Sequence, residues 1–222
     1  IRTIGELAET PGRSLRHLLG TANGEKLAAL AGNVDPRRIQ TSRRASSVGA
    51  QAALGLRDVS PELLRTTLGF LADRVAGRMR AAGRAGRTIT VRVRFADLRA
   101  VTRSLTLPGA ISATLTIAEV AVELAQSALI DHPSEHRITL LAISISQLVE
   151  QTALQLALPL ELDDEARHPG TVADATRWSA DRSVDAIRLR FGRDAIGYAS
   201  VVFSGAGHVP DAFRELAEHD PR

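Results

Sequence analysis

The spacing of apolar residues changes abruptly in the middle of this chain, and that change constrains the fold more than any other feature. Between positions 61 and 83 apolar side chains recur as on one face of a helix. Between positions 88 and 95 they alternate with Thr and Arg, as in a strand with one buried face. The apolar members are Leu64, Leu68, Leu71 and Val75, then Ile89, Val91, Val93 and Phe95. Helices packed against a sheet are therefore expected.

Further segments extend this pattern on both sides. A short extended segment at 47–52 precedes the helix, and a second alternating run at 102–107 follows the first strand. A helix is predicted from about Ala113 to Ile130, and a last strand from Arg137 to Ser146. The order strand, helix, strand, strand, helix, strand predicts an α+β fold, a ferredoxin-like βαββαβ sandwich. Both helices are expected to cover one face of the sheet.

The segments outside this sandwich differ from it in composition. Residues 1–34 carry apolar positions at helical spacing, interrupted by Pro and Gly, which predicts a cluster of short helices. Residues 35–47 are basic and aperiodic, which is typical of a linker. The sandwich at 48–150 is followed by a Pro-containing segment at 151–162 and an extension at 163–222, with a helix predicted at 171–191. Because the sequence opens at Ile1 within a continuing pattern, we expect a piece of a longer protein.

Positive charge is concentrated in the first half of the chain. Residues 1–110 contain 19 Lys or Arg against 8 Asp or Glu, whereas residues 111–222 contain 9 against 17. Of the 28 basic residues 27 are Arg, whose forked guanidinium suits phosphate oxygens. A GC-rich genome also enriches Arg, but it does not explain the clustering. The first half is therefore expected to bind a polyanion.

The uncovered face of the predicted sheet is the first candidate site. Its strands carry guanidinium and hydroxyl groups with no acidic residue between them, which suits phosphate contacts. An ordinary solvated face would carry mixed Glu and Lys. The candidate residues are Arg92, Arg94, Thr102, Arg103, Ser104 and Thr106.

Two segments nearer the N-terminus are further candidates. A turn from Gly20 to Gly24 leaves amides free at the start of the next helix, where a phosphate could bind, or it is an ordinary helix connection. The linker arginines are either solvated or placed to follow a nucleic-acid backbone. They are Arg37, Arg38, Arg43 and Arg44.

A hexapeptide after the last predicted strand presents one amide and three large apolar side chains on a segment that proline keeps from continuing as helix. Its residues are Gln155, Leu156, Ala157, Leu158, Pro159 and Leu160. It is either a peptide that docks into a groove on another protein or a strand end packed against this protein's own core.

Composition excludes or disfavours several classes of site. Without cysteine the chain has no disulfide and no thiolate metal site, and a cytoplasmic location is expected. No stretch approaches the ~18 consecutive apolar residues of a membrane span. The six His lack paired ligand spacing, and the acidic run Asp163, Asp164 and Glu165 is expected to be solvated. We predict no metal site and no catalytic residue in this chain.

Several short motifs occur together in the order found in one family. They are Asp35, Pro36 and Arg37 leading to Ser47, Val48 and Gly49, then Val91 to Leu98 followed by Thr102 to Leu107, then Leu140 to Ser146. With these motifs, residues 1–160 resemble the C-terminal part of Y-family translesion DNA polymerases of the bacterial polymerase IV type. The chain departs from the family at Gln51, Ala52 and Ala53, where a Glu and then Thr-Phe are usual.

The resemblance implies a partial thumb at 1–34 and a little finger domain that grips the backbone of primer-template DNA. The implied DNA contacts are Gly20, Thr21, Gly24, Lys26, Arg37, Arg38, Arg43, Arg44, Arg92, Arg94, Thr102, Arg103, Ser104 and Thr106. The hexapeptide resembles the family's sliding-clamp-binding peptide, through Gln155, Leu156, Leu158, Pro159 and Leu160. Polymerisation with Mg²⁺ is implied only for the parent protein, because the family keeps its metal ligands in a palm domain that this chain lacks. A monomer without a membrane partner is expected, with no cofactor in this fragment.

Three other functions are compatible with the sequence. A catalytically silent member of the same superfamily would act as an adaptor between the clamp and another polymerase. An RNA-binding module on the same sandwich would present aromatics for base stacking, and the polar strand positions carry none. An interaction domain without a nucleic-acid ligand would show no salt-dependent DNA binding.

Overall fold

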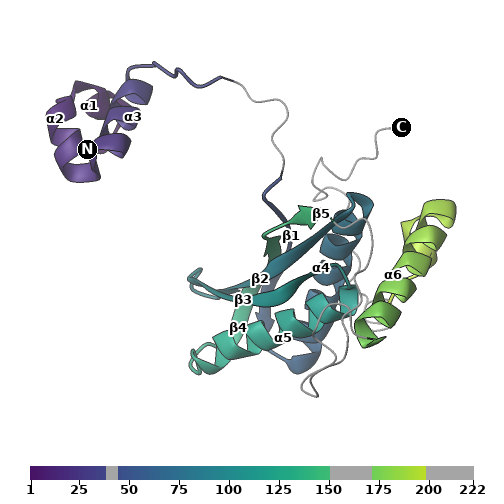
Figure 1. Ribbon diagram of the computed structural model, residues 1–222. Coiled ribbons are helices and arrows are strands. Elements are labelled where there is room, and N and C mark those ends of the chain that lie inside the picture. The colour runs from purple at the N-terminus through teal and green to yellow at the C-terminus, as the bar shows by residue number, and fades with distance from the viewer. Residues whose placement is uncertain (39–44, 151–171, 199–222) are drawn as a thin grey trace. The chain divides into compact units, whose positions relative to one another are not determined.

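The computed structural model describes residues 1–38, 45–150 and 172–198 of the 222-residue chain. Two compact units are present, Ile1–Arg44 and Ala45–Arg222 (Figure 1). The first is purely helical in its described part, and the second contains the sheet.

The first unit consists of three short helices, α1 (Ile4–Glu9), α2 (Gly12–Leu19) and α3 (Thr21–Ala31). The hydroxyl of Thr3 caps α1 by accepting from the Glu6 amide at 3.1 Å. Leu15 is fully buried, and Gly24 of α3 lies so close to α2 that a Cβ there would be 2.7 Å from the Leu15 carbonyl. The predicted cluster of short helices is confirmed.

The second unit follows the predicted order of strands and helices. Its elements are β1 (Ser47–Asp58), α4 (Pro61–Ala81), β2 (Arg84–Phe95), β3 (Ala100–Ile111), α5 (Thr114–Ile130), β4 (Arg137–Ser146), β5 (Val149–Glu150), α6 (Val172–Phe191) and the 3-10 turn η1 (Arg193–Ala195). The prediction of an α+β sandwich is confirmed.

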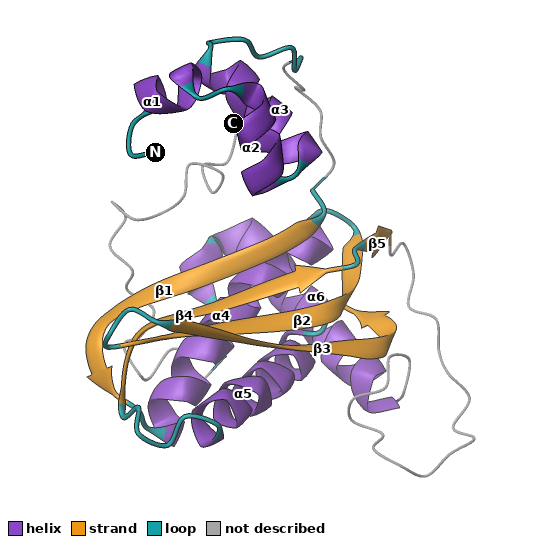
Figure 2. Cartoon of the chain, turned by 90° about the vertical axis from the view of Figure 1, so that its left-hand side faces the viewer, coloured by secondary structure: helices purple, strands orange, loops and turns teal. Residues whose placement is uncertain are grey.

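The strands lie in the order β1-β4-β2-β3, and every neighbouring pair is antiparallel. Strand β4 separates β1 from β2, and β2 separates β3 from β4, so two split βαβ units interlock. Helix α4 packs on β1 and β4, and α5 packs on β2 and β3. Both helices lie behind the sheet in Figure 2, so one face is covered, as predicted.

The core lies between the sheet and these two helices. Alternate residues of the central strands β2 and β4 are completely or almost completely buried, as the period-two pattern predicts. They are Ile89, Val91, Val93 and Phe95 with Leu141, Ile143 and Ile145. Each such side chain contributes roughly 1.5–3 kcal/mol relative to an exposed one.

Two strands are longer than the sequence suggested. Strand β1 continues to Asp58 after an irregularity between Ala53 and Arg57, so the departure from the family motif at 51–53 does not interrupt it. Strand β3 continues through Pro108, where we expected it to end. Because β3 is an edge strand, a residue without an amide hydrogen can be accommodated there.

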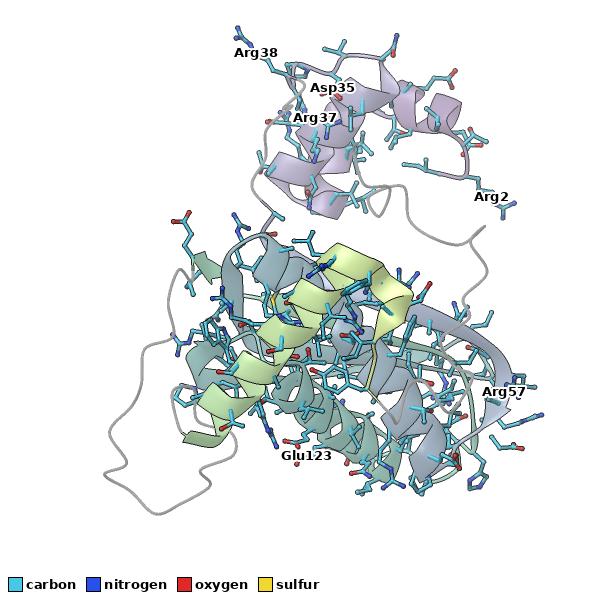
Figure 3. The ribbon with its side chains drawn as sticks, turned by 90° about the vertical axis from the view of Figure 1, so that its right-hand side faces the viewer. Arg2, Asp35, Arg37, Arg38, Arg57 and Glu123 are labelled. Atoms are coloured by element: carbon cyan, nitrogen blue, oxygen red, sulfur yellow. The ribbon has the colours of Figure 1, made fainter. Side chains whose placement is uncertain are left out.

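Helix α6 confirms the helix predicted at the C-terminal side, and it lies against the outer side of the helical layer (Figure 3). Arg80 of α4 is 6% exposed and holds α6 through two hydrogen bonds to Asp185, from Nε at 2.6 Å and from Nη2 at 3.0 Å. The Nη1 atom of Arg80 lies 3.0 Å from Asp181, which is 1% exposed. These contacts join residues about a hundred positions apart, and no pattern in the sequence predicts them.

Asp181 also completes the start of α5. The residue that precedes this helix, Ala113, has no side chain able to cap it. The Asp181 carboxylate accepts from the Thr114 amide at 2.7 Å and therefore satisfies a helix N-terminus from another part of the chain. Arg188–Asp73 at 2.7 Å and Arg177–Glu119 at 2.8 Å add two more ion pairs between α6 and the layer below.

Candidate nucleic-acid interface

The face of the sheet away from α4 and α5 consists of four cross-strand rows. Directly paired residues point to the same side of a sheet, so the pairing register defines each row. In the order β1, β4, β2, β3 the rows are Ser47, Ser146, Thr88 and Thr106; Gly49, Ser144, Thr90 and Ser104; Gln51, Ala142, Arg92 and Thr102; and Ala53, Leu140, Arg94 and Ala100. We term these residues the open face. It contains no carboxylate.

The first two rows carry only hydroxyl-bearing residues and one glycine. The hydroxyls of Thr88 and Thr106 are hydrogen-bonded to each other at 2.9 Å across the strands. Ser104 and Thr106 are exposed on the edge strand. Short polar side chains of this kind allow a sugar-phosphate backbone to approach closely and accept hydrogen bonds.

The two arginines of the open face differ in their freedom. The Nε atom of Arg94 donates to the Thr139 hydroxyl at 2.9 Å, so this guanidinium is held in place. Arg92 is exposed and forms no ion pair or hydrogen bond within the described part of the chain. Arg92 can therefore bind a phosphate without first breaking an internal contact.

Arg103 does not belong to the open face, and its predicted position there is wrong. It pairs across the strands with Val91, which is buried on the helical side, and its guanidinium lies 2.5 Å from Asp131 at the end of α5. The strand alternation already separates Arg103 from Thr102 and Ser104, and that signal is stronger than the charge that suggested a common surface.

The described linker arginines are in different situations. Arg37 forms two side-chain hydrogen bonds with Asp35, at 2.7 and 2.5 Å. These bonds, together with a third from the Arg37 amide, lower the pKa of the Asp35 carboxyl to about 2. Arg38 is exposed (Figure 3), while Arg43 and Arg44 lie outside the described residues. Arg37 must release Asp35 before its guanidinium can bind a phosphate.

The predicted turn from Gly20 to Gly24 is shorter than expected. Only Gly20 lies outside the helices, with a positive φ of 80°, and α3 starts at Thr21. No side chain of the described residues caps this helix start by a hydrogen bond, and binding of a phosphate there stays a prediction. The Gly24 amide instead donates to the Gly20 carbonyl, and Gly24 is buried against α2. Thr21 and Lys26 are exposed.

The open face presents hydroxyl and guanidinium groups and no carboxylate. Among the described residues no cluster of His, Asp or Glu could hold a metal ion. No helix of the described residues is both long enough and apolar enough to cross a membrane. The hexapeptide from Gln155 to Leu160 lies outside the described residues, as does the acidic run at 163–165.

Sequence reasoning missed part of the open face. It listed residues of β2 and β3 as candidate contacts, but not the residues of β1 and β4 that complete the rows, such as Gly49, Gln51 and Ser144. Alternation along each strand marked these residues as sharing a side. Only the strand order shows which of them lie beside Thr90 and Arg92.

Comparison with protein families identifies a match over half of the chain. The model of the impB/mucB/samB family C-terminal domain matches residues 45–158. This range covers the complete sheet and both helices of the sandwich.

Two relatives are similar in sequence, and one solved structure is similar in fold. The chain is 57% identical to DNA polymerase IV 2 of Mesorhizobium japonicum over 99% of its length, and 31% identical to DNA polymerase IV of Streptomyces coelicolor over 96%. It covers 53% and 44% of these relatives, so it spans about half of their length. A Y-family DNA polymerase chimera has a similar fold, with a TM-score of 0.53 and 15% identity over 67% of this chain and 42% of that one.

Proposed function

The chain belongs to the impB/mucB/samB family through its C-terminal domain, and from that premise we propose that it is the DNA-gripping part of a Y-family translesion DNA polymerase. The open face binds the backbone of primer-template duplex DNA through phosphates, without reading the bases. Binding of this kind suits a polymerase that must accept damaged templates of any sequence.

One observation carries this proposal: a sheet face of hydroxyls and arginines on which no carboxylate occurs and on which Arg92 has no internal partner among the described residues. A solvated face without a ligand is expected to carry acidic residues as well as basic ones. Aromatic side chains, which an RNA-binding sheet uses for stacking, are missing from all four rows.

The remaining parts of the function belong to the parent protein and to residues outside the described ranges. The parent polymerises DNA with Mg²⁺ held by a palm domain, and the hexapeptide from Gln155 to Leu160 docks into the processivity sliding clamp. A catalytically silent adaptor would share both binding properties. Palm carboxylates in the parent sequence distinguish the two.

The test is duplex binding measured over a series of salt concentrations for the unchanged chain, Arg92→Ala and Arg103→Ala. The first substitution removes the unpaired guanidinium from the open face. The second removes an equal charge from the neighbouring strand but from the opposite side of the sheet. It is therefore a matched control for non-specific loss of charge.

We expect Arg92→Ala to weaken binding and to reduce the slope of log Kobs against log salt by about 0.9, the value for one phosphate contact. Arg103→Ala should leave the slope within error of the unchanged chain. Equal effects of the two substitutions would show that net charge, not the open face, governs binding. Binding indifferent to salt would remove the nucleic-acid function altogether.

A further inference from the structure

A second basic surface lies far from the open face, on the outer side of the helical layer. There a cleft of about 800 Å³ opens between the C-terminal half of α4, the start of β2, and α6 with the turn that follows it. The cleft is lined by five arginines, one tryptophan and a single carboxylate. The charged and aromatic residues are Arg80, Arg84, Trp178, Arg182, Asp185, Arg188 and Arg193.

Two of the five arginines are committed to internal ion pairs. Arg80 is bound by Asp185, and Arg188 by Asp73 at 2.7 Å. Both contacts hold α6 against α4, so these two guanidinium groups are already paired and are not the ligand-binding groups of the cleft.

The other three arginines form no ion pair within the described residues. Arg84 donates only to the Ala45 carbonyl, at 2.9 Å. Arg193 has no hydrogen-bond partner in the described ranges, and Arg182 lies over an aromatic ring. Three guanidinium groups therefore line one cleft without an ion pair among the described residues, an arrangement that favours an anionic ligand. Glu150 stands opposite Arg84 in the register of β2 and β5.

Trp178 supplies a flat apolar surface next to these charges. It is half-buried, and the guanidinium carbon of Arg182 lies 4.8 Å from the centre of its ring. Gly77 of α4 also lines the cleft, and the place of its missing Cβ is open space. An aromatic face beside arginines is the arrangement with which proteins bind unpaired bases and their phosphates.

We propose that this cleft binds single-stranded nucleic acid. A base stacks against the Trp178–Arg182 pair, and Arg193 and Arg84 bind the flanking phosphates. Stacking on Trp178 requires a base with a free face. The bases inside a duplex are already stacked on one another and offer no such face to the tryptophan. The site uses different residues from the duplex grip and lies on the opposite side of the sheet, so neither proposal depends on the other.

Trp178 is the only tryptophan of the chain, which makes its fluorescence a direct probe of this cleft. The experiment is titration of the complete chain with a short oligothymidylate, with a duplex of equal length, with thymidine monophosphate and with inorganic phosphate. Saturable quenching is expected with the oligothymidylate, and weaker or no quenching with the other three. Quenching by phosphate alone, at the same affinity, would replace the proposal by a simple anion site.

Variants separate the cleft from general electrostatics. Arg182→Ala should weaken oligothymidylate binding roughly 5- to 150-fold, the range for loss of one stacking contact, and Arg182→Lys should restore part of it. Arg190→Ala is the matched control, since Arg190 is on the same helix and exposed but lies over Phe191 and does not line the cleft. Its affinity should be unchanged.

Binding of the Trp178→Ala variant is followed by the anisotropy of a labelled oligonucleotide and should also be weaker. Arg92→Ala should leave the Trp178 quenching intact, which distinguishes this site from the open face. No quenching by the oligothymidylate, or equal losses in Arg182→Ala and Arg190→Ala, would overturn the proposal.

Discussion

Removing the Arg80 side chain should reveal how much of the domain's stability depends on the docking of α6. The Arg80 guanidinium meets five acceptor atoms: two oxygens of Asp185, one of Asp181 at 3.0 Å, the Ser112 carbonyl at 2.8 Å and the Thr114 hydroxyl at 3.1 Å. Burial alone would lower the pKa of Arg80, but the hydrogen bonds to Asp185 and the charge of Asp181 outweigh it, and the net pKa is raised. The guanidinium is therefore charged at every pH at which the fold exists.

The size of the destabilisation follows from the buried carboxylate that Arg80→Ala would leave without its guanidinium. Asp181 is 1% exposed, and the donors that it would keep among the described residues are the Thr114 amide and the Tyr198 hydroxyl. An unpaired carboxylate at such a site costs about 3–5 kcal/mol. Release of α6 would let water reach the Asp181 carboxylate. The decrease in the free energy of unfolding therefore cannot exceed the free energy with which α6 is docked. We expect either a loss of this size or a visible detachment of α6.

The assay is urea unfolding followed by two signals, circular dichroism for the whole domain and the fluorescence of Trp178 for α6. Arg177→Ala is the control, because it removes a more exposed ion pair between α6 and α5, with side chains 21% and 44% exposed. That pair is expected to contribute about 0.2–1 kcal/mol. If Arg80→Ala destabilises no more than Arg177→Ala and Trp178 keeps its fluorescence, the buried ion pairs do not hold α6, and the reasoning is refuted.

Three further predictions concern other parts of the chain. Gly24→Ala should destabilise the first unit by about 1–3 kcal/mol in thermal unfolding, because the new methyl group would meet the backbone of α2, whereas Gly12→Ala, with open space around it, should be tolerated. Burial raises the pKa of Tyr198 above that of an unfolded tyrosine, which is about 10, and the hydrogen bond to Asp181 raises it further. The neutral hydroxyl therefore stabilises the fold below about pH 10, and this stabilisation is lost as the pH rises above that value. Tyrosinate absorbance of this single tyrosine should therefore appear together with release of α6, and ionisation at an ordinary pKa with α6 still docked would contradict this. Replacing Gln155 and Leu158 together by Ala should abolish binding to the sliding clamp in a pull-down, and unchanged binding would remove that role.

The contrast between Arg92 and Arg103 shows how far sequence reasoning extends. The period-two pattern of β2 correctly assigned one side to Ile89 and Val91 and the other to Thr90 and Arg92, because alternation is a local property of an extended backbone. Grouping Arg103 with Arg92 relied on charge instead of alternation. The pairing with Val91 and the ion pair with Asp131 show that the local pattern was the better guide.

The cleft beside α6 shows the opposite case. Its arginines and Trp178 come from segments about a hundred positions apart, and each is unremarkable in its own stretch of sequence. A helix at 171–191 was predictable from apolar spacing, but its docking surface was not. Ion pairs such as that of Arg80 with Asp181 form between distant segments that the fold brings together, and no periodicity in the sequence predicts them.

The sequence by itself determined the order of the elements and the buried side of each strand. It also determined that the polar side of the strands lacks Asp and Glu. These properties depend on neighbours two to four residues apart. Tertiary structure alone decided which strands lie side by side, which arginines are neutralised, and where α6 rests. Those outcomes depend on contacts between distant segments, whose free energies are set by burial and by the loss of water around paired charges.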